Sequence, residues 1–494
     1  MLKRTLLIAA ITAMLLSGAA VRADAAPAPW PGVKLLTTED FVEVVRWPDE
    51  PFIGDLGIVV AAGNRPFELH LSKSNYRAPI RVTQHDRTGR RSRFLAEATK
   101  ASFAEGLKDF FIVTVTRPDG TRVLRRDAGF CTDAWDRMRL TISAPETSRY
   151  PNGCSDIPYA KGTVLGIEAG WGMPLRTMPA LNVPDGEYTV TISVRYGYRR
   201  LFSISEQDAV ASVDVSLVTV DECCVEPPPE MRARRRAAAA APLRPVRPSG
   251  APAAAPATDT RPDLVAIPAW NIRIGNPDGH VDEPQPEPEG RDILRFSSTV
   301  WNAGPAPLVV DGFRNKGEPE MTGYQSFYKN GKRVGWKQIG AFEFDDRDGH
   351  QHWHFKDFAQ YRLLDAGKMD VLPAGKEAFC LAPTNAIDMT VPGADWSVHR
   401  VEFPGSMCGQ RSSLAIREVL QAGWADTYGT GTPGQEFDVT DLPNGTYFIE
   451  VAANPLGRLI ERVTSNNVAL REIVLGGTPG NRTVVVRPYQ GIAA

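Results

Sequence analysis

The stretch 184–194, Pro-Asp-Gly-Glu-Tyr-Thr-Val-Thr-Ile-Ser-Val, decides the fold class. A Pro-Asp-Gly turn stands directly before a run of alternating β-branched residues, which is typical of a strand in a hairpin. Residues 111–120 carry the same signals in the opposite order, a Phe-Ile-Val-Thr-Val-Thr run and then Pro-Asp-Gly. Long amphipathic helical periodicity is absent from this part of the chain. We therefore expect an all-β sandwich with one short helix near residues 95–104.

A second region of the chain repeats these features in the same order. Four features correspond between the two: Lys108-Asp109-Phe110 with Lys356-Asp357-Phe358, Cys131 and Cys154 with Cys380 and Cys408, Gly170-Trp171 with Gly423-Trp424, and Pro184-Asp185-Gly186-Glu187-Tyr188 with Pro443-Asn444-Gly445-Thr446-Tyr447. Self-similarity of this kind predicts two related β-sandwich domains. We place them at residues 26–225 and 261–494.

Residues 226–260 differ abruptly in composition from both regions. They contain three consecutive prolines, an Arg-rich run ending at Arg236 and an Ala/Pro-rich tract. Such a segment cannot bury enough apolar surface to fold, and its prolines keep it extended. We expect a disordered linker between the two domains.

Residues 1–25 have the form of a secretory signal peptide. Lys3 and Arg4 precede an apolar core, and Ala23-Asp24-Ala25 fits an A-x-A cleavage site. No later segment is apolar and long enough to span a membrane. We expect a secreted, periplasmic or cell-surface protein with no transmembrane segment after signal cleavage. The formal net charge of −2 argues against a nucleic-acid partner.

The six cysteines of an exported chain are most simply read as disulfide-forming. Two couples with similar spacing suggest the bonds Cys131–Cys154 and Cys380–Cys408. The adjacent Cys223 and Cys224 leave three arrangements open: a strained bond to each other, bonds elsewhere in the chain, or bonds between chains.

Three of the seven histidines, His350, His352 and His354, fall at positions i, i+2 and i+4. In a β-strand this spacing sends all three imidazoles to one face. Imidazole binds copper, zinc, iron and nickel, and three protein ligands leave a position open for substrate or oxygen. The alternative is a surface cluster that binds metals adventitiously. The flanking residues read as a folded strand, which favours a specific metal site.

The second copy resembles the catalytic domain of the lysyl oxidases, copper-dependent amine oxidases, from Pro262 to about Leu475. The motifs that carry the resemblance are Pro262-Asp263-Leu264-Val265, the three histidines followed by Phe358-x-x-Tyr361-x-Leu363-Leu364-Asp365, Gly375-Lys376-Glu377-Ala378-Phe379-Cys380-Leu381, Asp426-Thr427-Tyr428-Gly429, Gln435-x-Phe437-Asp438-Val439-Thr440, Gly445-x-Tyr447, Asn454-Pro455, and Glu461 with Asn466-Asn467. Each motif is weak alone, but together and in order they are specific.

The resemblance implies a particular chemistry. His350, His352 and His354 would bind one copper ion. Lys376 and Tyr428 would be joined into a lysine tyrosylquinone cofactor. The enzyme would then use molecular oxygen to convert primary amines, including protein lysine, to aldehydes, with release of ammonia and hydrogen peroxide.

The residue types suit that chemistry on their own terms. A tyrosine ring can be oxygenated to a quinone, and a neutral lysine amine can add to it. The reaction also needs a base, and Asp426 is the candidate because in a strand it shares a face with Tyr428. Taken singly, each has an ordinary alternative: Lys376 as an exposed loop lysine, Tyr428 as an aromatic at the core edge and Asp426 as a turn former.

The resemblance further implies a calcium site. Its ligands would be Asp263, the backbone carbonyl of Leu264, Glu461, Asn466 and Asn467, and these are the hard oxygen donors that calcium requires. Val463 stands where the family has a further acidic ligand. The alternative is that Asn466-Asn467 simply forms a turn.

The first copy lacks the residues of this chemistry. Ser102, Ala104 and Gly106 stand where the second copy has its histidines, Asp127 replaces the lysine and Leu175 replaces the tyrosine. We expect the first copy to be a structural or binding module. Two alternatives are that the whole protein is a non-catalytic copper-binding or cell-surface structural module, and that the first domain is a propeptide cut near Arg236.

Overall fold

The computed structural model describes most of the chain from residue 30 to residue 492. The described ranges are 30–46, 55–86, 91–95, 100–132, 137–151, 153–155, 157–175, 183–219, 245–250, 256–275, 290–330, 332–346, 351–374, 378–396, 408–432 and 434–492. The expected signal peptide, Cys223 and Cys224 lie outside them.

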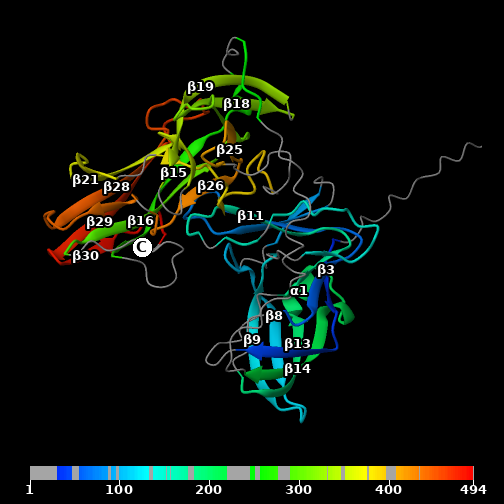
Figure 1. Ribbon diagram of the computed structural model, residues 1–494. Coiled ribbons are helices and arrows are strands. Elements are labelled where there is room, and N and C mark those ends of the chain that lie inside the picture. The colour runs from blue at the N-terminus through cyan, green and yellow to red at the C-terminus, as the bar shows by residue number, and fades with distance from the viewer. Residues whose placement is uncertain are drawn as a thin grey trace, which may run out of the picture.

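The N-terminal region, residues 30–219, contains three sheets (Figure 1). Their strand orders are β1(Val33–Thr37)-β3(Ile58–Ala62)-β12(Trp171–Pro174)-β10(Met138–Arg139), β11(Gly162–Ile167)-β4(Phe67–Ser72)-β5(Arg81–His85)-β6(Ser92–Phe94), and β2(Phe41–Arg46)-β14(Val210–Thr219)-β13(Gly186–Val194)-β8(Gly106–Thr116)-β7(Ala101–Ser102), with β9(Arg122–Phe130) also paired to β8. The pairs are antiparallel except β2 with β14.

The C-terminal region, residues 256–492, also contains three sheets. Their orders are β15(Leu264–Ile274)-β16(Ile293–Asn302)-β26(Trp424–Tyr428)-β24(Asn385–Ala386) with β27(Glu436–Asp438) on β16, then β23(Ala378–Phe379)-β20(His352–Lys356)-β19(Lys332–Asp345)-β18(Met321–Lys329)-β17(Leu308–Phe313)-β25(Ala415–Leu420), and β22(Asp370–Pro373)-β21(Ala359–Leu364)-β28(Gly445–Ala453)-β29(Val468–Thr478)-β30(Asn481–Val486). The predicted all-β class is confirmed.

The two regions share their strand pairing, as expected for related sandwiches. The order β1-β3-β12-β10 corresponds to β15-β16-β26-β24, and β14-β13-β8 corresponds to β29-β28-β21. Details repeat as well: Tyr188 and Tyr447 each donate a hydroxyl hydrogen bond to the carbonyl of the proline four residues earlier, at 2.7 and 2.8 Å. Asp109 and Asp357, in the repeated Lys-Asp-Phe motif, both have positive φ, 53° and 63°. Both expected disulfides, Cys131–Cys154 and Cys380–Cys408, are present.

The helix expected near residues 95–104 is wrong over its described part. Ala101–Ser102 is strand β7, paired with the start of β8, because a turn there folds the chain into a hairpin. The α-helix of the described residues is α1, Tyr196–Leu201, which packs Tyr198 onto Phe110. Two short 3-10 segments, η2 (Gln207–Ala209) and η3 (Thr258–Thr260), complete the helical elements.

The C-terminal end of the expected linker is packed on the second region. The Val246 carbonyl accepts a hydrogen bond of 2.9 Å from Arg333, and the Arg247 guanidinium lies over the Phe313 ring. The remaining linker positions, 226–244 and 251–255, lie outside the described residues.

Backbone hydrogen bonds join the N-terminal and C-terminal regions. Lys161 N–H and Gly162 N–H donate to the Ile387 carbonyl at 2.7 and 3.0 Å, and Met389 N–H donates to the Gly162 carbonyl at 2.9 Å. Figure 1 shows β11, which begins at Gly162, on the side of the N-terminal region nearest β26. Thus the N-terminal region supports the segment that pairs with β26.

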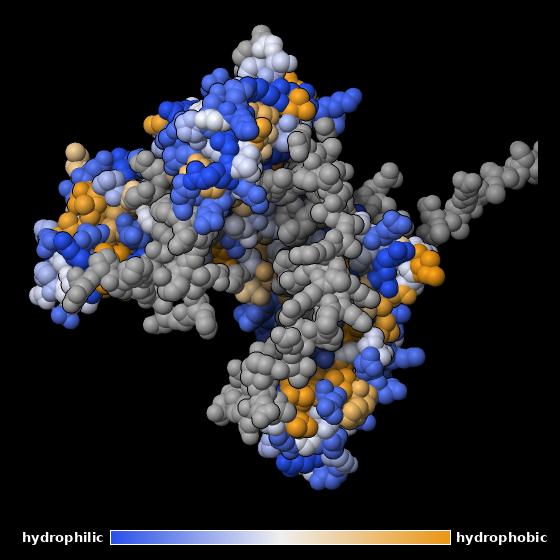
Figure 2. Space-filling view, viewed as in Figure 1, coloured by the Kyte–Doolittle hydropathy of each residue, from blue (hydrophilic) through white to orange (hydrophobic). Residues whose placement is uncertain are grey.

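The core of each region is largely apolar, but some charged side chains are buried in the C-terminal region, among them Arg295, Glu418 and Asp426. One cluster lies mainly in the N-terminal sheets and a second mainly in the C-terminal sheets, but Trp301 and Ile387 belong to the first, and Tyr150 and Val164 to the second. At the tip of the β18–β19 hairpin, where Figure 2 shows hydrophilic surface, Lys329, Lys332 and Arg333 are exposed. Among the described residues, no helix has the length and apolar character of a membrane span.

Candidate functional site

The histidine strand, β20, places its imidazoles as the alternation predicts. His352 and His354 share one face, and their Nε2 atoms lie 3.0 Å apart. Trp353 points the other way, is buried, and donates its indole N–H to the Gln410 carbonyl at 2.9 Å. His354 is 2% exposed, and its Nδ1 lies 3.5 Å from Asp345 Oδ2. A carboxylate behind a histidine of this kind fixes the ring that presents its other nitrogen to a metal. His350 lies outside the described residues.

The second set of candidate residues lies on β26. Tyr428 and Asp426 are two positions apart on this strand, and Asp426 is 3% exposed. The Tyr428 hydroxyl donates a hydrogen bond of 3.1 Å to the Cys380 carbonyl, and its ring meets the Phe379 ring edge-on at 5.0 Å. Burial, together with the charges of Asp426 and Glu418, raises the pKa of Tyr428 well above its ordinary value. The phenol therefore stays neutral in the protein without a metal.

The Cys380–Cys408 disulfide connects the histidine strand to Tyr428. Trp353 N–H, between the two histidines, donates to the Cys408 carbonyl at 2.8 Å. Cys408 is bonded to Cys380, whose carbonyl accepts the Tyr428 hydroxyl. In addition β23, which leads into Cys380, pairs with β20 through Phe355 and Phe379. Strands β20 and β26, about 70 residues apart in the chain, are thus held together in one assembly. Lys376 lies just before β23 in sequence, outside the described residues.

Sequence reasoning missed one further residue, Glu418 on β25. Its side chain is fully buried, and its Oε2 accepts the Leu381 N–H at 3.0 Å. That N–H and the Cys380 carbonyl belong to the same peptide unit, so Glu418 holds one end of the peptide whose other end receives Tyr428. Burial raises the pKa of Glu418 well above 4.5, and Asp426 adds to the rise. The sequence did contain a signal for a buried carboxylate. Glu418 lies between Ile416 and Leu420 at every second position, on a strand face that is otherwise apolar.

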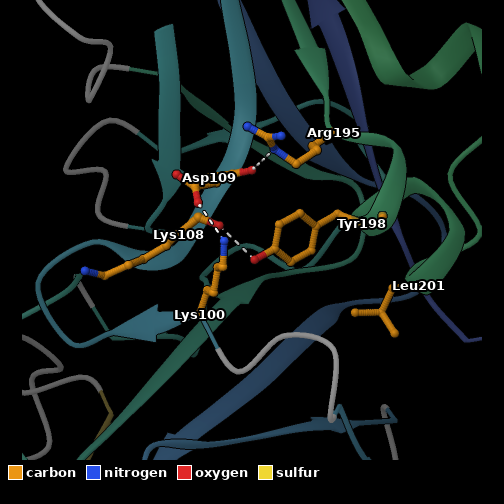
Figure 3. Close-up of a pocket in the computed structure, with 7 residues that line it drawn as sticks. Lys100, Lys108, Asp109, Arg195, Tyr198 and Leu201 are labelled. Atoms are coloured by element: carbon orange, nitrogen blue, oxygen red, sulfur yellow. Dashed lines mark hydrogen bonds and ion pairs between the residues drawn. The ribbon is translucent and has the colours of Figure 1, made fainter.

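The first copy has a different arrangement at the corresponding positions. Asp127, which stands in the place of Lys376, forms an ion pair of 2.5 Å with Arg195. Arg195 also donates to the Asp109 carbonyl at 3.0 Å and lines a cavity of about 190 Å³ with Lys108 and Tyr198 (Figure 3). Leu175, in the place of Tyr428, is buried in the apolar core. Ser102 begins the turn that precedes β8 and accepts the Glu105 N–H.

The five candidate calcium ligands come together at the start of β15. Glu461 accepts the Leu264 N–H at 2.9 Å and the Asn467 side-chain N–H at 2.8 Å, and Asn466 donates to Asp263 at 3.0 Å. Asp263, Glu461 and Asn467 are 6–8% exposed. The side-chain carbonyl oxygens of Asn466 and Asn467 are buried without a hydrogen-bond partner among the described residues. Buried oxygens without hydrogen-bond partners, next to two carboxylates, are the ligands that a hard cation such as calcium would bind.

Comparison with known proteins finds relatives of the C-terminal region. Residues 331–485 match the model of the lysyl oxidase family. Over 126 residues the chain is 33% identical to pig protein-lysine 6-oxidase and 32% identical to the human protein, and over 179 residues it is 28% identical to mouse lysyl oxidase homolog 4. Residues 331–485 belong to the lysyl oxidase family.

The extent of these matches is limited. The alignments cover 25%, 25% and 36% of this chain, and 44%, 26% and 18% of the pig, human and mouse proteins respectively. The chain therefore spans less than half the length of these relatives. The lysyl oxidase match includes β20, β26 and Asn466-Asn467, whereas Asp263 and the entire N-terminal region precede it.

Proposed function

We propose that the lysyl oxidase domain is an exported, copper-dependent amine oxidase. It would convert primary amines, including protein lysine, to aldehydes. Each turnover would consume one amine, one molecule of oxygen and one water, and would release ammonia and hydrogen peroxide. The single observation that carries the proposal is the assembly in which the Cys380–Cys408 disulfide joins the histidine strand to Tyr428.

The donor set fits copper. His352 and His354 present two Nε2 atoms 3.0 Å apart, close to the separation of two nitrogen ligands on one metal ion. Imidazole is a preferred copper ligand. In this proposal His350 supplies the third nitrogen. When bound, copper and the lysine tyrosylquinone from Lys376 and Tyr428 supply the redox chemistry.

The other residues bind, orient and move protons. Asp426 removes the proton from the carbon next to the amine nitrogen, and its burial keeps that carboxyl out of bulk water. Glu418, through the Cys380–Leu381 peptide, fixes the carbonyl that orients the Tyr428 hydroxyl. Phe379 covers one edge of the Tyr428 ring and limits its rotation.

A calcium ion at Asp263, the Leu264 carbonyl, Glu461, Asn466 and Asn467 is part of the proposal. It would tie the start of β15 to the turn before β29, and β15 itself packs against β28 and β29. Its role would be structural, because its ligands lie at the start of β15 and just before β29, whereas Asp426 and Tyr428 lie on β26.

The test is chemical. Full-length protein is incubated with copper in air, digested with trypsin and searched by mass spectrometry for a peptide joining Lys376 to Tyr428, while peroxide release is followed with a simple primary amine. The proposal expects both signals in the wild type and neither in Tyr428→Phe. Stoichiometric copper on an uncrosslinked chain without peroxide would leave a metal-binding sandwich and refute the enzyme.

A further inference from the structure

A second group of metal-binding side chains lies in the N-terminal region. Glu68 and His70 are two positions apart on β4, and His85 is on the neighbouring strand β5. Leu69 pairs with Gln84 in the register of these strands, so Glu68, His70 and His85 project from the same face of the sheet. One donor atom from each of the three lies within 4.8 Å of the others. They are the two histidines of the first 225 residues and a carboxylate beside them.

The carboxylate of this group is already oriented. Glu68 is 7% exposed, and its Oε1 lies 2.9 Å from His70 Nε2. Its other oxygen accepts the Tyr150 hydroxyl at 2.9 Å and an Arg149 N–H at 3.0 Å. Hydrogen bonds of this kind to the far oxygen of a carboxylate are typical of the surroundings of metal ligands.

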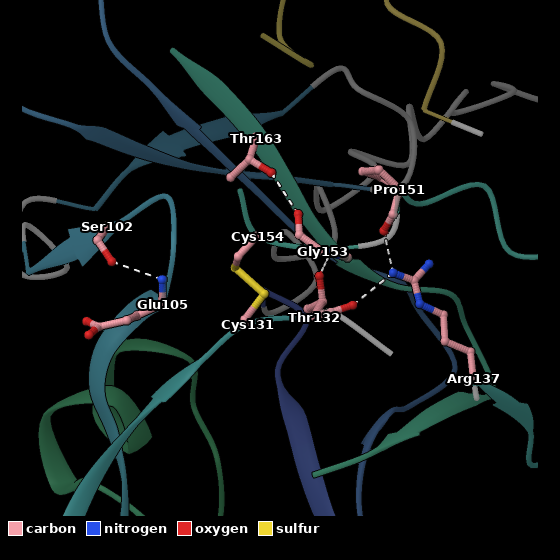
Figure 4. Close-up of a disulfide and its surroundings, with 10 residues drawn as sticks. Ser102, Glu105, Cys131, Thr132, Arg137, Pro151, Gly153, Cys154 and Thr163 are labelled. Carbon is pink, nitrogen blue, oxygen red and sulfur yellow. Dashed lines mark hydrogen bonds between the residues drawn. A yellow bond between two sulfur atoms is a disulfide. The ribbon is translucent and has the colours of Figure 1, made fainter. Parts of the chain in front are cut away.

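Trp396 and Arg137 hold the residues next to this group in place. The Trp396 ring, from the C-terminal region, meets His70 edge-on at 5.5 Å and stacks on Tyr150 at 6.1 Å. Figure 4 shows Arg137 donating to the Thr132 carbonyl beside the Cys131–Cys154 disulfide and to the Pro151 carbonyl. Arg137 also donates to the Tyr150 carbonyl at 2.7 Å, so the chain at Tyr150 is anchored. The group is therefore built into the boundary between the two regions.

We propose that Glu68, His70 and His85 bind one divalent transition-metal ion of the zinc or copper class. Two imidazoles and one carboxylate are a donor set that suits these metals and leaves a fourth position for water. Ligand atoms on a tetrahedral zinc ion lie about 3.4 Å apart. The Glu68–His70 pair is near that separation already. The His85 ring is stacked on His70 with centroids 3.9 Å apart, so metal binding turns this partly exposed ring until one nitrogen faces the ion.

The proposal is independent of the amine oxidase. None of the three residues lies in the segment that matches the lysyl oxidase family. The ion would instead hold the sheet of β4 and β5 against Trp396. Trp396 follows β24 in the chain, and β24 pairs with β26, the strand that carries Tyr428.

The experiment uses zinc as the probe on the full-length protein. Metal-free wild type is dialysed against a zinc buffer, and bound zinc per chain is measured by elemental mass spectrometry. The double variant His70→Gln/His85→Gln is expected to bind one zinc ion fewer than the wild type. The variant His352→Ala/His354→Ala is expected to keep that ion, which separates this site from the proposed copper site.

A further variant tests whether the site is built or adventitious. Tyr150→Phe leaves all three ligands in place but removes one of the two hydrogen bonds that orient Glu68, and it is expected to weaken zinc binding about tenfold or more. Equal zinc content in the wild type and the double variant would overturn the proposal. So would a Tyr150→Phe variant with unchanged affinity, because surface histidines need no oriented carboxylate. Circular dichroism and a denaturation midpoint on each metal-free variant check that it is folded.

Discussion

Replacing Glu418 with glutamine should make the stability of the protein less sensitive to pH. Because the pKa of Glu418 is raised by burial, the folded protein holds a proton at pH values where the unfolded chain has already released it. The contribution of Glu418 to the stability therefore falls as the pH rises above the ordinary value of 4.5, until the pH passes the folded pKa. The slope of this loss approaches about 1.4 kcal/mol per pH unit for one proton.

Glutamine has nearly the same shape, accepts the Leu381 N–H in the same way and does not titrate. The difference in unfolding free energy between Glu418→Gln and the wild type should therefore grow by about 1.4 kcal/mol for each unit between pH 5 and the folded pKa. Groups that titrate elsewhere in the chain cancel in this difference. The measurement is a urea denaturation series at several pH values, on both proteins without metal.

Leucine at the same position tests the hydrogen bond itself. Glu418→Leu leaves the buried Leu381 N–H without its acceptor, which costs about 1–3 kcal/mol of unfolding free energy relative to Glu418→Gln. A peptide that loses this hydrogen bond also holds the Cys380 carbonyl less firmly against Tyr428. If the weaker hold on Tyr428 raises the activation free energy of crosslink formation by about 1 kcal/mol, the crosslink forms roughly fivefold more slowly. A pH-independent difference between glutamine and wild type, or equal behaviour of the leucine and glutamine variants, would refute this reasoning.

Three more substitutions have defined outcomes. Asp426→Asn removes the proposed base and should lower amine-dependent peroxide release about 10²- to 10⁴-fold, while the Tyr428 crosslink, followed by mass spectrometry, still forms. Calcium should raise the melting temperature of the wild type, and Asn466→Ala should largely abolish that increase in calorimetry, because it removes one of the buried oxygens left over for the ion. Gly162→Val should destabilise the contact between the regions by about 1–3 kcal/mol, since a Cβ there would lie 2.1 Å from Asp388 Oδ1; unchanged urea denaturation would contradict it.

Much of the fold and part of the candidate site follow from local patterns in the sequence. Turn residues before alternating β-branched runs predicted strands such as β13 and β28, because the periodicity of two is a property of the strand itself. The same periodicity placed His352 and His354 on one face. Cysteine spacing gave both disulfides, since the repeated motifs aligned the two copies.

Other features of the protein could not be predicted in this way. The helix expected at 95–104 failed because the hairpin of β7 and β8 competes for the same residues. The role of Glu418 was missed because its partner peptide is 37 residues away and is brought near only by the sheet. The group formed by Glu68, His70 and His85 was missed for the same reason, as it depends on the register of two strands.

The sequence by itself determined the all-β class, the two related regions and the identity of the histidine strand, because these depend on spacing between neighbours in the chain. Only the tertiary structure decided which strands meet. It placed Tyr428 against the Cys380 peptide and Glu418 behind that peptide, and it set the N-terminal region against residues 387–389. These contacts rest on sheet register and buried hydrogen bonds between distant segments, which strand periodicity alone leaves undetermined.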